Sequence, residues 1–582
     1  MTDSPLTLNG GLLYVPAIRI ILETLGYNKR ILRWILLSKL LQWVSGLRIK
    51  DIGDNATLSE VMKYRGVSFW WFIRFRIYRN LAIAFGKGQY HRSLTRAIFS
   101  KFNFLFFFYT IFVAFISKCI FPKRKKLRPN TIFVSYSFGG WRFFRDRLTG
   151  KLVWGHSLLS PVLDALSATS KCPEIISSYP IALNFPSLFK PAFQLSRNSK
   201  LGLFVPLESY FSWASFVQIL RARRHFSKVW TKLKQNQGLV LDLDGWNILE
   251  LFNTDFKYFF KFFLPLMVQY MELSIQLLKR EQPDIILMKN EYSEYERALQ
   301  FAAHFKKTPI VALQHGIINQ NHPGYYYARN MVSQKGSAQF PYAPIPTKTA
   351  VFGPYYKKIL TKRCSYPIER VDVTGSPRND VLHFADQIYN KQMFCDCFGL
   401  DPTKKIVLIA TQPLHVEKNR VDFLYNLIEA LREVPDTQIV IKPHPNESSS
   451  WHKKHLKEWE VFAVILPPKS ETNAAIHACD LFIAVHSTTI IEALLLGKLV
   501  IVVNFSKSPD ILPWVQEGAV LGVYDPQELA PVIKKALFNE EAIRQELANR
   551  SKFVYNHTYK NDGKATERVI GVIKKYLRPI SS

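Results

Sequence analysis

The sequence predicts an α/β protein with two doubly wound domains behind a basic helical segment. From residue 131 onward, short runs of branched apolar residues alternate with helical patterns, which is typical of parallel βαβ units. A second series of the same kind begins near residue 405. The first 125 residues differ from both, because they hold 20 Lys/Arg against 5 Asp/Glu.

The whole chain is ordinary in hydrophobicity but strongly basic. Of its 582 residues, 48% are hydrophobic and 21% charged, which excludes a largely disordered or collagen-like chain. Lys and Arg number 77 against 45 Asp and Glu, so the formal net charge is +32. Such a protein is expected to meet nucleic acid, an anionic membrane surface or phosphorylated substrates.

Residues 1–125 are expected to form a basic, aromatic-rich helical subdomain that associates with a membrane. Residues 17–45 place basic positions along one side of a helix, and residues 68–85 mix Trp and Phe with Arg. Both patterns suit a membrane interface, and the alternative is an ordinary helical core. Between Glu60 and Asp146 lie 85 residues without an acidic side chain.

The longest apolar run, Phe102–Ser117, lies in this stretch. As a helix it measures about 24 Å, short of the ~30 Å of bilayer hydrocarbon. A basic cluster at 123–128 follows and suits anionic headgroups on the cytoplasmic side. The sequence leaves open whether residues 102–121 span, dip into or avoid the membrane. We expect a peripheral or monotopic position at the inner face of the plasma membrane.

Signals for export are not expected. The N-terminus, Met1–Pro5, lacks the basic start and small-residue cleavage site of a secretory signal. The six cysteines are scattered, and Cys395 and Cys397 have no second pair or nearby histidine to complete a zinc site. We therefore expect reduced thiols in a cytoplasmic protein.

Two Rossmann-like domains are expected, over residues 126–385 and 386–582. In the first, the predicted strands are Thr131–Ser135, Asp284–Met288, Pro309–Leu313 and Val371–Thr374. In the second, they are Lys405–Ala410, Gln438–Lys442, Val461–Leu466, Leu481–Val485 and Leu499–Val503. Helical patterns separate the strands, so both sheets are expected to be parallel.

A hydroxyl-rich turn follows the predicted strand Leu481–Val485. Ser487, Thr488 and Thr489 lead into a short helix that contains Glu492. A helix N-terminus there aims backbone N–H groups at an anion, and the hydroxyls add donors. The alternative is a plain capping box, since Thr489 and Glu492 have the required spacing.

Lys442-Pro443-His444-Pro445 ends another strand of the second domain. In open α/β sheets, ligands bind at the carboxyl edge of the strands. The two prolines restrict the turn, Lys442 can neutralise a diphosphate, and His444 can donate a hydrogen bond to it.

Two candidates for the catalytic base follow strands of the first domain. His315, in Gln314-His315-Gly316, is a general base, a hydrogen-bond donor or a core histidine. Glu291 is placed to meet an acceptor hydroxyl, or else is a glutamate at a helix start.

Together these motifs resemble the GT-B glycosyltransferases of bacterial surface and capsular polysaccharide synthesis. Related types are polysialyltransferases and teichoic-acid glycerophosphotransferases. The resemblance covers roughly residues 130–560. It rests on Gln314-His315-Gly316, Thr374-Gly375-Ser376-Pro377-Arg378, Lys442-Pro443-His444-Pro445, and Ser487-Thr488 with Glu492. The acidic-Gly base motif of the polysialyltransferases is replaced by Asn290-Glu291-Tyr292.

The resemblance implies transfer of a sugar from a nucleotide-activated donor to a glycan or lipid-linked acceptor. His444, Ser487 and Thr488 are assigned to the donor phosphates. From the residues themselves, Lys442, Thr489 and Glu492 are expected to bind the donor too. Glu291, or failing that His315, takes the proton of the acceptor. No cofactor is expected. Asp242 and Asp244 form an Asp-x-Asp pair that is read as a polar turn, so a metal-independent enzyme is expected.

Three alternatives remain open. A nucleotide-sugar epimerase shares the motifs of the second domain but needs no membrane-facing segment. A glycerophosphotransferase acts on similar phosphate donors. A nucleic-acid-binding protein fits the net charge, but the sequence has no helix-turn-helix, zinc-finger or single-strand-binding signature.

Overall fold

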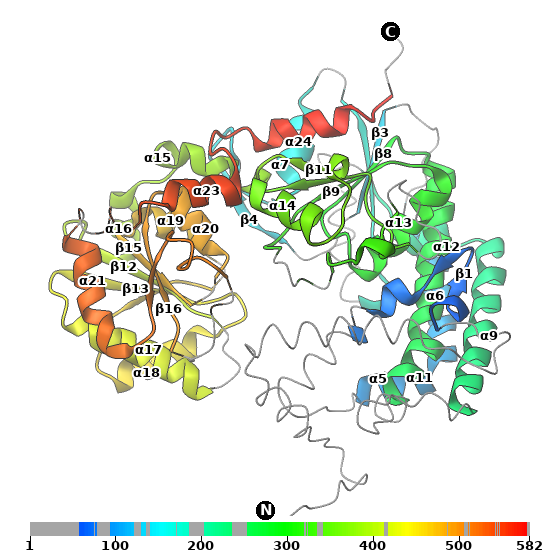
Figure 1. The fold of residues 1–582 in the computed structure, drawn as a ribbon, viewed down its shortest axis with the longest axis horizontal. Helices are drawn as coiled ribbons and strands as arrows, with labels where there is room; N and C mark the ends of the chain where they lie inside the picture. The colour runs from blue at the N-terminus through cyan, green and yellow to red at the C-terminus, as the bar shows by residue number, and fades with distance from the viewer. Residues whose placement is uncertain are drawn as a thin grey trace, which may run out of the picture.

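The first domain is built around a seven-stranded parallel sheet (Figure 1). The strand order is β11-β10-β9-β8-β3-β6-β7. The strands are β3 (Thr131–Ser135), β6 (Glu174–Ser178), β7 (Leu203–Phe204), β8 (Ile285–Met288), β9 (Ile310–Leu313), β10 (Lys348–Val351) and β11 (Val371–Val373). This computed structural model describes residues 58–74, 76–77, 94–121, 130–135, 140–169, 172–184, 203–235, 253–318, 322, 324–333, 342–412, 417–468, 470–485, 487–505, 510, 512–539, 541, 543, 545 and 547–578.

Helices cover both faces of this sheet, which explains its continuous apolar strands. One face packs against α9 (Trp213–Gln235), α12 (Leu264–Glu281) and α13 (Glu294–Lys306). The other packs against α7 (Ser160–Ser167) and α24 (Ala565–Lys574). Neighbouring residues in β8 point to opposite cores: Ile286 joins the first cluster and Leu287 the second.

The second domain holds a six-stranded parallel sheet in the order β14-β13-β12-β15-β16-β17. Its strands are β12 (Lys405–Ala410), β13 (Thr437–Lys442), β14 (Val464–Ile465), β15 (Leu481–Ala484), β16 (Leu499–Val503) and β17 (Leu521–Val523). One face packs against α16 (Lys391–Phe398), α19 (Thr472–Ala478), α20 (Thr489–Leu495) and α23 (Arg550–Thr558). The other packs against α17 (Glu417–Arg432), α18 (Ser449–Glu458) and α21 (Leu529–Phe538).

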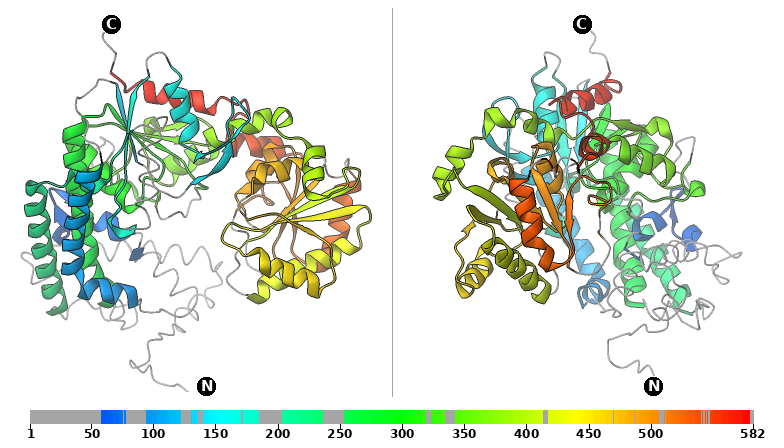
Figure 2. Two further views of the ribbon diagram at one scale, coloured as in Figure 1. Left: turned by 180° about the vertical axis from the view of Figure 1, so that it is seen from behind. Right: turned by 60° about the vertical axis from the view of Figure 1, so that its left-hand side comes forward.

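The predicted fold class is therefore confirmed: the chain forms two doubly wound α/β domains side by side (Figure 2). All nine predicted strands are present, with β14 shorter than expected. The sequence analysis missed β6, β7, β10 and β17, and also the antiparallel hairpins β1 (Lys63–Tyr64) with β2 (Val67–Ser68) and β4 (Trp141–Arg145) with β5 (Leu152–His156).

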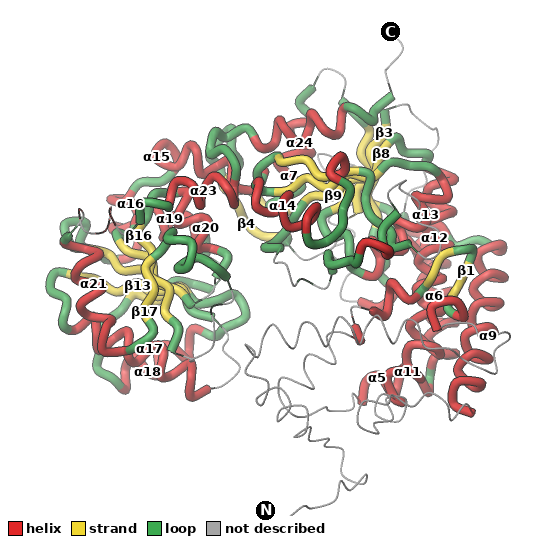
Figure 3. The backbone as a smooth tube through the Cα atoms, in the orientation of Figure 1, coloured by secondary structure: helices red, strands yellow, loops and turns green. Residues whose placement is uncertain are grey.

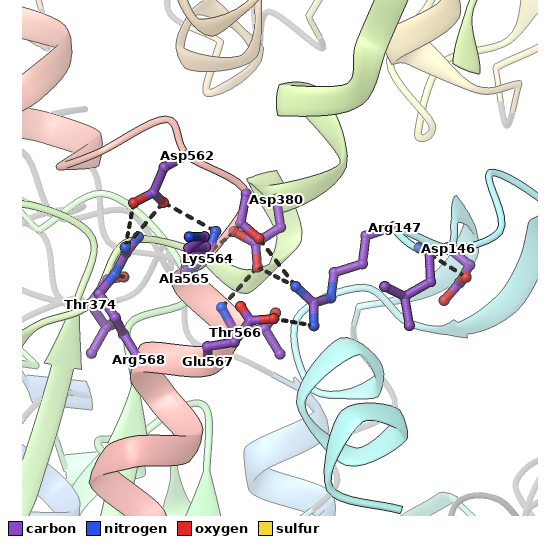
Figure 4. Close-up of polar contacts among 12 residues, drawn as sticks. Asp146, Arg147, Thr374, Asp380, Asp562, Lys564, Ala565, Thr566, Glu567 and Arg568 are labelled. Carbon is purple, nitrogen blue, oxygen red and sulfur yellow. Dashed lines mark hydrogen bonds and ion pairs between the residues drawn. The ribbon is translucent and has the colours of Figure 1, made fainter. Parts of the chain in front are cut away.

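The C-terminal helix α24 returns to the first domain. Val569 and Ile573 are fully buried in the cluster that includes β3 and β8. Asp380, which follows β11, accepts the backbone N–H groups of Ala565 and Thr566 at 2.9 and 2.8 Å and so fixes the start of the helix (Figure 4). The domain ranges expected from the sequence stay predictions, but residues 565–574 pack on the first sheet.

The hairpin β4–β5 lies between the two domains (Figure 3). Arg145 at the end of β4 forms an ion pair with Glu471 of the second domain at 3.0 Å. In the loop that follows, Arg147 forms an ion pair with Glu567 of α24 at 2.6 Å (Figure 4). The hairpin thus joins the second domain to the C-terminal helix.

The described part of the N-terminal segment packs onto the first domain. It comprises α3 (Leu58–Val61), the hairpin β1–β2, a turn of helix around Trp70, α5 (Leu94–Lys101) and α6 (Asn103–Ile120). Trp70, Trp71 and Phe72 are buried in the same core as α9 and α12. The membrane-interface interpretation of these three residues is therefore wrong, and the alternative of a helical core holds there. Three further predictions concern residues outside the described part of the chain: the helix over residues 17–45, the basic cluster at 123–128, and the pair Asp242 and Asp244.

Candidate active site

Both sheets have a switch point, where the strand order reverses direction. In the first sheet it lies between β3 and β8, and in the second between β12 and β15. Ligands of open α/β sheets bind outside the carboxyl ends of the strands at such points. The turns after β8 and β15 are therefore the geometric centres of the candidate site.

The two predicted phosphate-binding turns lie at the same edge of the second sheet. Lys442 ends β13 and His444 follows it, and Ser487 to Thr489 follow β15. Only β12 separates these parallel strands, so their ends are about 10 Å apart at the usual strand spacing. Both turns can face one nucleotide.

His444 is held by a carboxylate that the sequence analysis missed. Its backbone N–H donates to Glu447 at 2.9 Å, and Thr411 at the end of β12 donates to the same carboxylate oxygen at 2.6 Å. The Asn446 N–H donates to His444 Nδ1 at 3.1 Å. In neutral His444 the proton therefore sits on Nε2, which becomes a donor for a ligand.

The hydroxyl-rich turn is partly exposed and does not form a capping box. Ser487 Oγ and Thr489 Oγ1 lie 2.6 Å apart, and Thr488 is exposed. Thr488 takes the N-cap position of α20, but its side chain makes no capping hydrogen bond. Both Ser487 and Thr488 thus present hydroxyls at the sheet edge.

Glu492 reaches across the domain boundary. Its Oε1 lies 3.1 Å from Nη2 of Arg378, which follows β11 in the first domain. The second oxygen, Oε2, is buried and has no hydrogen-bond partner among the described residues. A buried carboxylate oxygen needs a donor, and a ligand hydroxyl at this place supplies one.

Lys442 is buried and bonded to the protein. Its Nζ donates to the Pro468 carbonyl at 2.6 Å and to the Pro443 carbonyl at 3.3 Å. Burial lowers the pKa of this ammonium to about 8. These contacts give Lys442 a structural role in tying the loop after β14 to the turn. Its expected contact with the donor phosphates stays a prediction.

His315 is a partly exposed histidine at the end of β9. Its Nε2 lies 3.3 Å from the Tyr292 hydroxyl. Burial lowers its pKa to about 4, and the positive charges of Lys289 and Arg378 act in the same direction. The imidazole is therefore neutral at pH 7, and its low pKa makes it a weak base.

Glu291 is placed in the core. Its carboxylate accepts hydrogen bonds from the hydroxyls of Tyr366 and Thr349 at 2.6 and 3.1 Å, and only 4% of the residue is exposed. Burial raises its pKa to about 7, as a base requires, but both partners are themselves buried. This position does not favour Glu291 as the base; between the two predicted candidates, His315 is the less buried one.

Three basic residues near this end of the first sheet were missed by the sequence analysis, and a fourth, Arg378, belongs to a motif that it quoted. Lys289 follows β8 at the switch point, and Arg378 follows β11. Arg142 lies in β4, and burial of its guanidinium, together with the charge of Arg378, lowers its pKa. His156 ends β5. The signal available in the sequence was the position of Lys289 directly after a buried strand. Arg142 and His156 meet the site only through the tertiary fold.

Among the described residues, no group of three or more His, Cys, Asp or Glu side chains is suited to hold a metal ion.

The comparisons with known proteins agree with a transferase. Residues 288–575, nearly half of the chain, match the family model described as CDP-glycerol:poly(glycerophosphate) glycerophosphotransferase. This match supports a transferase of cell-surface polymer synthesis. The likeness to polysialyltransferases stays a prediction. A search of curated proteins finds no significant match.

Solved structures resemble the chain at low identity. The UDP-GlcNAc 2-epimerase of Neisseria meningitidis bound to UDP-GlcNAc is 13% identical, with 76% of this chain and 100% of that chain covered and a TM-score of 0.46. The putative epimerase of Listeria monocytogenes is 13% identical, with 78% and 98% covered and a TM-score of 0.46. The wall teichoic acid polymerase TagF, soaked with CDPG, is 12% identical, with 83% and 98% covered and a TM-score of 0.42.

The contacts of Lys442 predict a loss of stability when it is replaced. In Lys442→Met the Pro468 carbonyl loses its charged donor, so the free energy of unfolding should fall by about 1–3 kcal/mol in urea denaturation. Lys404→Met, at an exposed position, is the control and should change little. Unchanged stability combined with weaker nucleotide binding would instead assign Lys442 to the donor site.

Proposed function

We propose that this protein transfers a sugar from a nucleotide-activated donor to a hydroxyl of a glycan or lipid-linked acceptor in surface polysaccharide synthesis. The observation that carries the proposal is the Arg378–Glu492 contact between the domains. On the second-domain side of this contact, the hydroxyls of Ser487, Thr488 and Thr489 and the imidazole of His444 lie at the carboxyl edge of the sheet. On its first-domain side lies the neutral His315.

The donor nucleotide binds to the second domain. The Nε2 proton of His444 and the hydroxyls of Ser487, Thr488 and Thr489 face its phosphates. Glu492 accepts a hydrogen bond from a ribose hydroxyl through Oε2, the buried oxygen without a described partner. These groups are fixed before the reaction, so they stabilise negative charge that grows on the leaving phosphate.

His315 takes the acceptor proton. The acceptor oxygen then forms a bond to the anomeric carbon, the bond from that carbon to the phosphate oxygen breaks, and the nucleoside diphosphate leaves with the electron pair. The pKa of about 4 keeps the imidazole unprotonated at neutral pH. No step calls for a cofactor or metal ion.

A second candidate is transfer of glycerophosphate, and two observations favour it. The family model matched by residues 288–575 is described by that activity. In addition, positive charges of Lys289 and Arg378 act on His315. Attack on phosphorus places negative charge beside the base, which cations stabilise, whereas a sugar transition state carries positive charge.

The nucleotide product separates the two reactions. Sugar transfer from a nucleoside diphosphate sugar should release a nucleoside diphosphate, because the bond to the sugar carbon breaks. Glycerophosphate transfer should release a nucleoside monophosphate, because a P–O bond of the diphosphate breaks. Chromatography of the nucleotides formed from CDP-glycerol and from nucleotide sugars measures this. An epimerised free nucleotide sugar, formed without acceptor, would reject both transfers.

Two histidine variants should separate binding from turnover. In His444→Ala, nucleotide binding should weaken about tenfold or more, since a hydrogen bond to a charged group is lost. In His315→Ala, nucleotide affinity should persist while turnover falls about 10²–10⁴-fold. Calorimetric titration with UDP, CMP, CDP and GDP, followed by rate measurement, tests both. Equal nucleotide affinity in His444→Ala and the parent protein would contradict the donor site.

We also propose a peripheral position on an anionic membrane, through α6. This is the one helix in the described part of the chain that is long and apolar enough to cross a bilayer, and 28% of it is buried. One face packs on the first domain through Phe107, Val113 and Ala114. The other exposes at least half of the surface of five large side chains: Phe104, Leu105, Phe108, Phe112 and Phe115.

This exposed face has the features of a helix that lies in an interface. An apolar stripe continues along about three turns, and exposed Lys101 and Lys118 stand near its ends. Trp213, 77% exposed, lies near this helix, since it stacks on Phe216, which stacks on Phe107 of α6. Since one face of α6 is held by protein, attachment from one side fits better than a span.

Replacement of this face should release the protein from membranes. The triple change Phe108→Ser, Phe112→Ser and Phe115→Ser should lower the fraction that sediments with phosphatidylglycerol vesicles at least tenfold, because apolar burial is lost. The matched triple change Ile368→Ser, Phe462→Ser and Phe538→Ser alters exposed residues elsewhere and should have little effect. If the parent protein does not sediment with these vesicles at low salt, the membrane proposal is contradicted.

A further inference from the structure

An exposed aromatic pair lies on one face of the hairpin β4–β5. Phe143 and Trp154 stand directly opposite each other in the register of the two strands, so their side chains share a face. The ring centroids are 5.0 Å apart and the rings meet edge to face at 62°. Each residue is 56% exposed. More than half of this aromatic surface is therefore open to a ligand.

The face that carries the pair reaches the carboxyl edge of the first sheet. Alternate residues of a strand share a face, so His156 lies on the same face as Trp154. A Cβ on Gly140 would stand 2.7 Å from His156 Nε2 and 3.2 Å from Lys289 Nζ. Lys289 follows β8 at the switch point of this sheet. One end of the face is therefore beside the candidate active site.

The other end of the same face reaches the second domain. Arg145, which alternates with Phe143, forms an ion pair with Glu471 at 3.0 Å. The Tyr389 hydroxyl donates to the same carboxylate at 2.7 Å. Phe143 is three residues from Gly140 and two from Arg145, or about 10 Å and about 7 Å along the strand. The aromatic pair thus lies between the switch point and the second domain (Figure 3).

The surroundings of the pair suit a sugar ring better than a lipid chain. The C–H groups on one side of a sugar ring carry partial positive charge, which the negative face of an aromatic ring attracts. The hydroxyls of the sugar need hydrogen-bond partners, and the Arg145–Glu471 pair borders the aromatic surface with side chains that are 30% and 15% exposed. An acyl chain placed here would remove water from this charged pair without replacing its hydrogen bonds, which is unfavourable.

We infer that Phe143 and Trp154 form a subsite that stacks against a sugar ring of the acceptor glycan. The Arg145–Glu471 pair binds hydroxyls of the same ring. His315 follows β9, which pairs with β8 at the switch point, whereas the subsite lies about 10 Å further along the hairpin. The stacked ring is therefore not the reacting one, and the acceptor is an oligosaccharide. This inference rests on the proposed function, in which a glycan meets the donor between the domains.

The hairpin lies outside the part of the chain that matches the transferase family. That match covers residues 288–575, which include the donor turns at His444 and Ser487, whereas the hairpin ends at His156. The aromatic subsite is thus separate in sequence from the groups assigned to the donor. A preference for one acceptor glycan can therefore reside in the hairpin without any change in the donor site.

Replacement of both rings by leucine tests the subsite. The double variant Phe143→Leu, Trp154→Leu keeps an apolar surface but removes both aromatic faces, and it should fold because both positions are exposed. The probe is an array of oligosaccharides from bacterial capsules and cell walls, applied to the full chain and followed by calorimetry of the glycans that bind. The parent should bind at least one of them, and the double variant should bind it about tenfold more weakly. Trp154→Phe keeps an aromatic face and should bind nearly as the parent does.

The matched control is Phe462→Leu with Phe538→Leu, which removes two exposed rings of the second domain and should leave glycan affinity unchanged. A parent that binds no glycan of the array, or a double variant that binds like the parent, would overturn the inference. A loss of affinity for UDP, CMP, CDP or GDP in the double variant would assign the rings to a nucleobase instead. Weaker sedimentation with phosphatidylglycerol vesicles would assign them to lipid.

A further variant separates failure of this inference from failure of the proposed function. His315→Ala should lose turnover but bind glycans as the parent does, because the stacked ring is remote from the base. Glycan binding that depends on Phe143 and Trp154, in a protein that transfers no sugar from any nucleotide sugar, would reject the proposed reaction and leave the glycan subsite standing.

Discussion

The ion pair between Arg378 and Glu492 is the interaction on which the candidate site depends. It joins the segment after the last strand of the first sheet to helix α20 of the second, with the glutamate side chain 9% exposed. A buried carboxylate that loses its partner is left as an uncompensated charge, which is strongly unfavourable. The pair therefore fixes how the turn after β15 stands relative to His315. Burial lowers the pKa of both His315 and Arg142, and the charge of Arg378 acts in the same direction on each.

The strands and their carboxyl ends were predictable from the sequence because they are set by local pattern. Buried parallel strands such as Leu499–Val503 are uninterrupted branched runs, and the polar residue after each run lies at the sheet edge. The short strands β7 and β17 leave no such pattern. The hairpin Trp141–Arg145 with Leu152–His156 was missed because its exposed aromatic and basic residues resemble the interface-like segments before it.

The roles of the site residues were less predictable, because they depend on partners far away in sequence. Lys442 is bonded to the carbonyl of Pro468, and Glu291 accepts from Thr349 and Tyr366. No local sequence motif indicates these contacts. By contrast, His444 could be identified from its two flanking prolines and its place after a strand. The residue that holds it, Glu447, is three positions further on and gave no signal of its own until the fold brought Thr411 beside it.

The stretch between Glu60 and Asp146 holds no acidic side chain, and it contains α6, whose exposed Phe residues form the proposed membrane face. A carboxylate on this face would repel an anionic lipid headgroup, at a cost that grows as water is excluded. The absence of acidic residues around α6 is therefore compatible with the proposed position on an anionic surface.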